Sequence, residues 1–236
     1  MIITDYTVLD LEMTGLAPKT DRIIEIGAVK VKNGVVADTL GMLVNPKMIV
    51  PQRVTELTGI TTEMVKGGED MDQAVQKLID FIGDDVLVGH NVSFDYSFIK
   101  QWAINNRVPL ELKAWDTLRL ARNLLPPGQS KKLEELCAFF NIDRPKGHRA
   151  LDDALQTREL FEILLKLVPE EKRESLLTPV VLCYKAKRQT PATKHQIERL
   201  KEYMEKKQIK DPVNWESLTR NEASRLQDQY YGKYGR

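Results

Sequence analysis

The chain opens with three stretches whose apolar residues dominate or alternate with polar ones, as in β-strands. They cover residues 6–12, 22–31 and 35–44, and Asn33-Gly34 between the last two is a strong signal for a tight hairpin turn. Over residues 72–82 the spacing changes, because apolar residues recur three and four positions apart, as on one face of a helix. The pattern therefore predicts strands joined by a hairpin, followed by an amphipathic helix.

Helices and strands alternate along the rest of the first two thirds of the chain. Short apolar runs predict buried strands at residues 86–88 and 114–115, and helical spacing predicts helices at residues 94–104, 118–124, 131–140 and 150–167. A hairpin followed by such alternation is typical of an α/β domain with a mixed sheet that is covered by helices on both faces.

The pattern breaks over residues 178–193, where prolines and the basic run Lys185-Ala-Lys-Arg188 indicate a linker. Two capping boxes follow, Thr193-Lys-His-Gln196 and Thr219-Arg-Asn-Glu222, and each begins a run with helical spacing. We therefore expect three parts: an α/β domain over residues 1–177, a linker over residues 178–192, and a small basic helical module over residues 193–236.

Composition narrows the class of protein. With 236 residues, of which 42% are hydrophobic, the chain has enough apolar side chains for a real core. It has no basic leader and no run of about eighteen apolar residues, so we expect a soluble cytoplasmic protein without a membrane partner. Cys137 and Cys183 lie in apolar surroundings without metal-binding spacing, and we interpret both as reduced core thiols.

The net charge of +1 conceals an asymmetry between the two ends of the chain. Residues 1–182 carry 22 basic and 27 acidic side chains, whereas residues 183–236 carry 13 and 7. The basic tail is suited to attract phosphates, and its tyrosines Tyr230, Tyr231 and Tyr234 are suited to stack on bases. A solvated helical surface and a small tyrosine-containing core explain the same residues.

The first candidate chemistry lies in the run Tyr6-Thr-Val-Leu-Asp-Leu-Glu12. Residues two apart share one face of a strand, so Asp10 and Glu12 project together while the leucines face the opposite layer. Paired hard oxygens suit Mg²⁺ or Mn²⁺, although a solvated acidic face at a sheet edge is the simpler explanation. Gly15 ends the strand and permits a ligand to approach closely, or it simply forms a turn.

Two further segments carry candidate residues. Asp95 lies in the first turn of a helix that follows a buried strand, where α/β sheets build their sites, although an acidic residue there also stabilises the helix dipole. His148 and Asp153 would point about 140° apart if both were helical, so a shared site requires His148 in the loop that Gly147 makes plausible. Helical geometry leaves the choice between Asp152 and Asp153 open. We interpret His90 as a residue without a catalytic role.

Together, three motifs resemble the DEDDh exonucleases: Asp10-x-Glu12 with Thr14-Gly15, Asn91-x-x-Phe94-Asp95, and His148-x-x-x-x-Asp153. This family of the ribonuclease-H-like fold includes the proofreading epsilon subunit of bacterial DNA polymerase III. The resemblance covers roughly residues 4–167, and it extends to Ile23-Ile-Glu-Ile-Gly27, Leu57-Thr-Gly-Ile60 and Trp115-Asp-Thr-Leu-Arg-Leu-Ala121.

The resemblance implies a role for each residue of the motifs. It chooses Asp153 over Asp152, and it makes Asp10, Glu12, Asp95 and Asp153 the ligands of two divalent cations, Mg²⁺ or Mn²⁺. His148 would be the general base that takes a proton from the attacking water. The resemblance also implies that the terminal nucleotide is held by Thr14, Gly15, Leu16, Asn91 and Phe94.

The expected function is therefore a metal-dependent 3′-to-5′ exonuclease that releases nucleoside 5′-monophosphates from single-stranded or frayed DNA. It would serve proofreading or repair, freestanding or with a DNA polymerase as partner. One alternative keeps the site and changes the substrate to RNA, because the 2′-hydroxyl is read by loop contacts that the motifs do not locate. The other is a noncatalytic subunit that binds nucleic acid or a polymerase.

Overall fold

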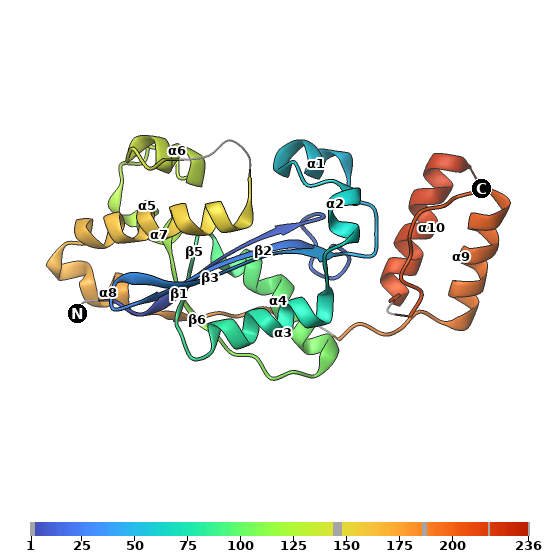
Figure 1. The fold of residues 1–236 in the computed structure, drawn as a ribbon, viewed down its shortest axis with the longest axis horizontal. Helices are drawn as coiled ribbons and strands as arrows, with labels where there is room; N and C mark the ends of the chain where they lie inside the picture. Colours follow the sequence, from blue (N-terminus) through green and yellow to red (C-terminus); the bar gives the residue numbers. More distant parts are fainter. Residues whose placement is uncertain (1–2, 144–147, 186–187, 217, 236) are drawn as a thin grey trace.

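The computed structural model describes residues 3–143, 148–185, 188–216 and 218–235. Its first three strands are β1 (Tyr6–Met13), β2 (Ile23–Lys32) and β3 (Val35–Asn45), which pair as an antiparallel meander (Figure 1). The predicted hairpin turn is confirmed, because Asn33 and Gly34 both take the positive φ that a tight two-residue turn requires.

The remaining strands extend the sheet on both sides. They are β4 (Glu69–Asp70), β5 (Leu87–Gly89), β6 (Lys113–Asp116) and β7 (Val180–Val181), and the order across the described sheet is β4-β3-β2-β1-β5-β6-β7. β5 pairs parallel with β1 and with β6, so the sheet is mixed, as the sequence predicts. The helices of this part are α1 (Gln52–Thr58), α2 (Thr62–Lys66), α3 (Met71–Ile82), α4 (Val92–Asn106), α5 (Thr117–Leu124), α6 (Leu133–Phe139), α7 (Ala150–Leu167) and α8 (Arg173–Leu177).

Helices cover both faces of the sheet, which confirms the predicted three-layer α/β architecture (Figure 1). On one face α3 and α4 pack with Leu9 and Leu11 in one apolar cluster. On the other face α5, α6 and α7 pack with Tyr6 and Val8. The alternation of β1 thus divides its side chains between two cores, as a period of two requires.

The expected linker over residues 178–192 needs correction at both ends. Val180 and Val181 form strand β7, which pairs antiparallel with β6, and Leu182 donates its N–H to the Leu112 carbonyl. At the other end Pro191 pairs with Thr219. Two β-branched residues carry no readable periodicity, so their place at the sheet edge is set by pairing alone. Ala186 and Lys187 of the predicted basic run lie outside the described residues.

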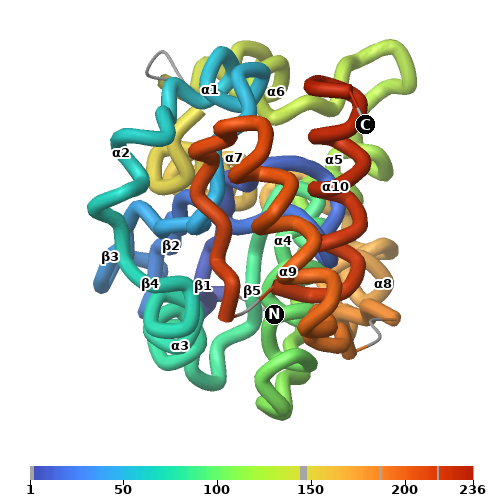
Figure 2. Tube along the Cα trace, turned by 90° about the vertical axis from the view of Figure 1, so that its right-hand side faces the viewer, coloured from blue at the N-terminus to red at the C-terminus, as the bar shows by residue number. Residues whose placement is uncertain are grey.

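The tail forms a small helical module, as predicted, with α9 (Lys194–Lys206) and α10 (Arg220–Tyr234). Both predicted capping boxes are present at its helix starts. Its apolar cluster contains Tyr230, Tyr231 and Tyr234, which favours the core explanation of the tyrosines over the stacking one. Figure 2 views the molecule from the side of the module, with α9 and α10 in front of the rest of the chain.

Two other expectations concern single residues and membranes. Cys137 is buried as predicted, but Cys183 is exposed, because it follows the edge strand β7 and lies outside both cores. No helix among the described residues combines the length and the apolar character needed to cross a bilayer.

Gly27 determines how closely α7 approaches the sheet. A Cβ atom at this position would lie 2.1 Å from the carbonyl carbon of Ala150, at the start of α7. Gly27 is the cross-strand partner of Asp10, so the absent side chain leaves room for a helix start directly beside the candidate carboxylates.

We expect Gly27→Ala to destabilise the fold by about 1–3 kcal/mol or more, because the new methyl group meets backbone atoms that cannot rotate away. The free energy of unfolding from urea titration measures the effect. Gly128→Ala is the matched control, since a Cβ there meets nothing within 4 Å and its backbone needs no positive φ. Equal stability of the two variants would contradict this account of the α7 approach.

Candidate active site

Asp10 and Glu12 share the face of β1 that α7 covers. They continue the row of Tyr6 and Val8, while Leu9 and Leu11 lie in the opposite core, as predicted. Both carboxylates belong to half-buried residues, unlike the fully buried side chains that precede them in the row. The row therefore changes from apolar core to acidic groups where it reaches the carboxyl end of the strand.

The carboxyl end of β1 extends beyond its parallel neighbour β5. The described pairing of the two strands covers Thr7 with Leu87 and Val8 with Val88, and β5 ends at Gly89. Further along β1, the Leu11 N–H has no hydrogen-bond acceptor on β5. It donates instead to Asp95 Oδ1, over 3.1 Å. Asp95 lies in the first turn of α4, as predicted, and this bond holds its carboxylate against the backbone between Asp10 and Glu12.

Asp95 is only 6% exposed, and this burial raises the pKa of its carboxyl to about 7. The hydrogen bonds from the backbone N–H groups of Asp95 itself and of Leu11 act in the opposite direction, and the neighbouring charge of Asp116 raises the pKa further. An ionised carboxylate at this position is costly without positive charge close by. A bound cation would supply such charge.

His148 lies in the loop directly before α7, which is the location that a shared site requires. Its Nδ1 atom is 3.5 Å from Asp153 Oδ2, and Asp153 is 4% exposed. Glu12, His148 and Asp153 each offer one ligand atom, and these atoms all lie within 4.8 Å of one another. The structure thus brings together residues that are more than 130 positions apart in the chain. Gly147, expected in this loop, lies outside the described residues.

The rotation of α7 separates the two adjacent aspartates. Asp153 is buried beside His148, whereas Asp152 is partly exposed and lines a shallow groove with Arg149 and Met42. Helical geometry alone left this choice open, and the choice implied by the family resemblance agrees with the geometry.

Glu25 is a residue of this region that the sequence motifs did not single out as functional. It is 5% exposed and lies opposite Glu12 on β2. Its Oε2 accepts the Ala150 N–H over 2.9 Å, and its Oε1 accepts Nε and Nη2 of Arg149 over 2.9 and 2.5 Å. These bonds tie the first residues of α7 to the sheet. A single acid in the otherwise apolar run of residues 23–29 was the sequence signal for this tie.

The loop of residues 14–22 leaves β1 beside this cluster. Thr14 is buried, and its N–H donates to the Arg22 carbonyl while its Oγ1 accepts the Arg22 N–H. Gly15 is buried against the Asp21 carboxylate, and Leu16 is 76% exposed. An exposed leucine next to a polar cluster is a suitable contact for a base, which agrees with the predicted role of Leu16 without testing it.

The other two expected substrate residues lie at the start of α4. Asn91 is exposed, takes a left-handed conformation and donates its N–H to Asp116 Oδ1, while the half-buried Phe94 packs edge-on against Phe98. His90 is held between Thr117 Oγ1 and the Lys131 carbonyl, and its burial lowers its pKa. This structural role agrees with the interpretation of His90 as noncatalytic.

The donor set fits divalent metal ions. Its gathered part consists of the carboxylates of Glu12 and Asp153 and the imidazole of His148, and hard cations prefer oxygen ligands of this kind. Asp10 lies on the same face of β1 as Glu12, and Asp95 is bonded to the backbone between them. Asp10, Glu12, Asp95 and Asp153 are the residues that would hold such ions. The candidate ligands are far apart in the sequence because they come from different elements, namely the later part of β1 and the starts of α4 and α7.

Comparison with known proteins gives a family match over most of the α/β part. Residues 7–161 match the RNase_T family, described as Exonuclease. The DNA polymerase III PolC-type protein of Clostridium perfringens is 41% identical over 167 residues, which are 71% of this chain and 12% of that protein. The chain therefore spans about an eighth of the length of the curated relatives it matches.

Two solved structures share the fold at low sequence identity. Exonuclease X in complex with 5′ overhanging duplex DNA has a TM-score of 0.56 at 24% identity, and the match covers 73% of this chain and 99% of that one. Exonuclease I of E. coli in complex with a dT13 oligonucleotide has a TM-score of 0.63 at 18% identity, with 74% and 43% covered. At these identities the likeness concerns the fold.

The two adjacent aspartates of α7 offer a direct test of the metal site. We expect Asp153→Asn to weaken Mn²⁺ binding by about tenfold or more, because a neutral amide replaces a charged ligand. Asp152→Asn is the matched control and should bind Mn²⁺ like the unchanged protein. Calorimetric titration of each variant with Mn²⁺ measures the affinity. Loss of binding in the Asp152 variant instead would place the site on the other side of α7.

Proposed function

The chain belongs to the RNase_T exonuclease family, and from this premise we propose that it is a metal-dependent 3′-to-5′ exonuclease that shortens single-stranded or frayed DNA and releases nucleoside 5′-monophosphates. The observation that supports it most directly is the meeting of Glu12, His148 and Asp153 within 4.8 Å, with Asp95 held at the adjacent backbone of β1. A relic fold with only a binding role gives no reason to bury carboxylates in this arrangement.

In this proposal the four carboxylates of Asp10, Glu12, Asp95 and Asp153 hold Mg²⁺ or Mn²⁺. Two such ions would supply positive charge that stabilises the transferring phosphoryl group and would lower the pKa of the attacking water. His148 accepts the proton of that water, and its place in a loop with a side chain 34% exposed gives it access to solvent. The Asp153 carboxylate next to Nδ1 orients the ring and stabilises the imidazolium that results.

The loop of residues 14–22 and the start of α4 form the walls of the substrate site. In the proposal, backbone groups of Thr14 and Gly15 contact the terminal sugar, Leu16 packs on the base, and Asn91 and Phe94 line the neighbouring wall. Contacts of this kind carry little sequence information, so weak sequence preference is expected.

The relatives and neighbours bear on substrate and partner. The Clostridium perfringens relative is a DNA polymerase III, and the solved structures with this fold include complexes with DNA and one with a histone mRNA stem-loop. The polymerase relative supports DNA as the substrate, a proofreading or repair role, a polymerase as partner and the cytoplasm as location. An RNA substrate remains the alternative activity, since the carboxylate cluster itself does not read the 2′-hydroxyl.

The activity is tested with 5′-labelled single-stranded DNA, duplex DNA and RNA, each with Mg²⁺, Mn²⁺ or a chelator. We expect product ladders that shorten from the 3′ end of DNA only when metal is present. Asp10→Asn should lower the rate by about 10²-fold or more while the circular-dichroism spectrum is unchanged. Asp152→Asn serves as the matched control with full activity. Activity that persists in both Asp10→Asn and Asp153→Asn would refute the metal-site assignment, and a ladder from RNA alone would establish the alternative.

The proposed base gives the reaction a characteristic pH dependence. Histidine accepts a proton only in its neutral form, so the rate should fall as the pH is lowered from about 8 to 5. His148→Gln should be slow and should lack this histidine-dependent decline. The profiles are measured at saturating Mn²⁺ to keep the metal bound. A wild-type rate that is flat over the same range would remove His148 from the proton transfer.

A further inference from the structure

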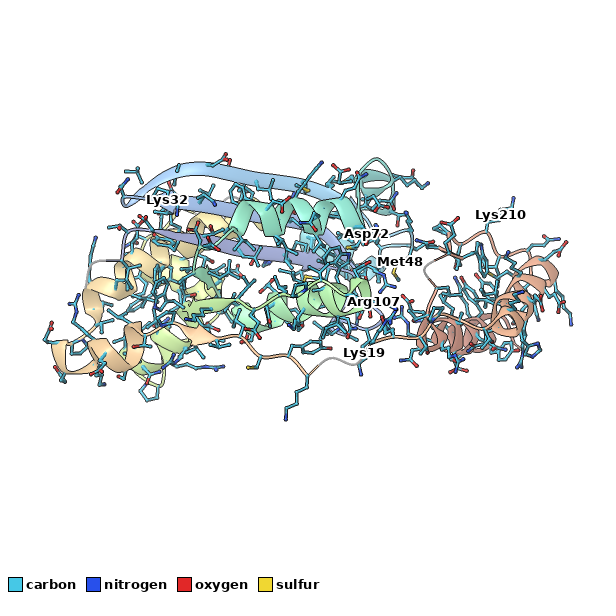
Figure 3. All side chains as sticks on the ribbon, turned by 90° about the horizontal axis from the view of Figure 1, so that it is seen from below. Lys19, Lys32, Met48, Asp72, Arg107 and Lys210 are labelled. Atoms are coloured by element: carbon cyan, nitrogen blue, oxygen red, sulfur yellow. The ribbon has the colours of Figure 1, made fainter. Side chains whose placement is uncertain are left out.

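The C-terminal module contacts the rest of the chain at the loop of residues 14–22. Here the module means the described residues of 191–235, and the body means the described residues before 183. Figure 3 shows Lys19 of this loop at the end of the body that faces the module, with Lys32 at the opposite end. The loop is the one that carries Thr14, Gly15 and Leu16, so the module lies next to a wall of the candidate site.

Two ion pairs make this contact. Arg22 pairs with Glu222, and Arg225 Nη1 lies 3.3 Å from Asp21 Oδ1. Arg225 also donates from Nη2 to the Thr20 carbonyl over 3.0 Å. The four side chains are between 8% and 29% exposed, so solvent screens these pairs less than pairs on an open surface. Burial and the charge of Arg225 lower the pKa of Arg22 to about 10, which leaves it charged at neutral pH.

The same loop residues are bonded to residues beside the group of Glu12, His148 and Asp153. Arg22 exchanges two hydrogen bonds with Thr14, which is two positions after Glu12. The Asp21 carboxylate accepts the Ala17 N–H over 2.9 Å and packs against Gly15. Arg22 and Asp21, the two loop residues in the ion pairs, are therefore each one bond or one contact away from a proposed substrate residue.

Among the described residues the module and the body share no apolar cluster, so these ion pairs contribute to the module's position together with the hydrogen bonds of Gln189 to Asn105 and to the Lys19 carbonyl. The apolar cluster of the module includes only residues from 192 onwards, and the clusters of the body end at Tyr184 within the described chain. A cavity of about 340 Å³ lies between the two parts and is lined by Arg22, Glu222 and Arg225 among others. Without a shared apolar core, directional bonds are what hold the module at the loop.

We propose that the C-terminal module braces the loop of residues 14–22, so that Arg225 and Glu222 act as positioning residues for binding of the terminal nucleotide. This inference rests on the proposed nuclease function. An unbraced loop samples more conformations, and substrate binding must then order it at an entropic cost. Loss of the brace should weaken substrate binding and spare the chemical step, for which the carboxylates of Glu12 and Asp153 would hold the metal ions and His148 would take the proton.

The alternative role for a basic module is direct attraction of the nucleic-acid strand by charge. The two roles predict opposite results for Asp21→Asn. Removing a negative charge next to the site should tighten binding of a polyanion if attraction is what matters. If the brace matters, the same substitution weakens binding, because it removes the charged partner of Arg225.

The experiment compares kcat and KM of the full-length protein on 5′-labelled oligothymidylate with Mn²⁺. We expect Arg225→Ala and Asp21→Asn each to raise KM by about tenfold with nearly unchanged kcat, and the double variant to be no worse than the more impaired single one. Arg225→Lys should recover part of the loss. Arg220→Ala is the matched control, since it removes the same charge from an exposed position of the same helix.

The outcomes separate this inference from the proposed function. If the wild type is active, two results would overturn the brace and leave the nuclease assignment standing. One is that Arg220→Ala raises KM as much as Arg225→Ala does. The other is that Asp21→Asn lowers KM. A fall in kcat without a rise in KM would also overturn it. A wild type without nuclease activity would overturn both. Circular-dichroism melting of each variant shows that the module remains folded.

Discussion

The site depends on one structural constraint, which is that β1 continues after its parallel neighbour β5 has ended. Within a sheet, the N–H groups of a strand donate hydrogen bonds to carbonyl groups of the neighbouring strands. Beyond Gly89 that neighbour is absent, and the Leu11 N–H is satisfied by the Asp95 carboxylate instead. The same short β5 allows α4 to begin early enough to bring Asp95 to this point. A longer β5 would satisfy Leu11 by pairing and would remove Asp95 from the carboxylates of β1.

Buried acidic groups near this strand end need positive charge or hydrogen-bond donors close by. Glu25 and Asp95 differ in how far the protein supplies them. Glu25 is buried but accepts bonds from Arg149 and from the Ala150 N–H, so its charge is compensated within the protein. Asp95 is equally buried, yet its backbone bonds do not offset the burial, and its pKa is raised to about 7. Glu25 is thus tied to the start of α7 by its bonds, whereas a charged Asp95 would need further positive charge nearby.

Much of this arrangement could be predicted from local patterns, and the reasons for the failures are physical. The two-residue period of β1 placed Asp10 and Glu12 on one face, and helical spacing placed α7 at the residues it occupies. The choice between Asp152 and Asp153 needed the rotation of α7, a helix whose first residue is bonded to Glu25 and lies close to Gly27 on a distant strand. The two-residue strand β7 and the exposure of Cys183 depend on pairing at a sheet edge, for which so short a segment has no periodic signal.

One side chain in the contact between module and body has two roles, because Glu222 both caps helix α10 and pairs with the loop of residues 14–22. Glu222 Oε2 accepts the N–H and Oγ1 of Thr219 in the capping box that begins α10, while its Oε1 pairs with Arg22 of the loop. The orientation of the carboxylate that reaches Arg22 is therefore fixed by the formed helix start, since the capping bonds exist only when α10 is folded. Under the proposed brace, order in the loop of residues 14–22 would depend on folding of a helix some two hundred residues away in the chain.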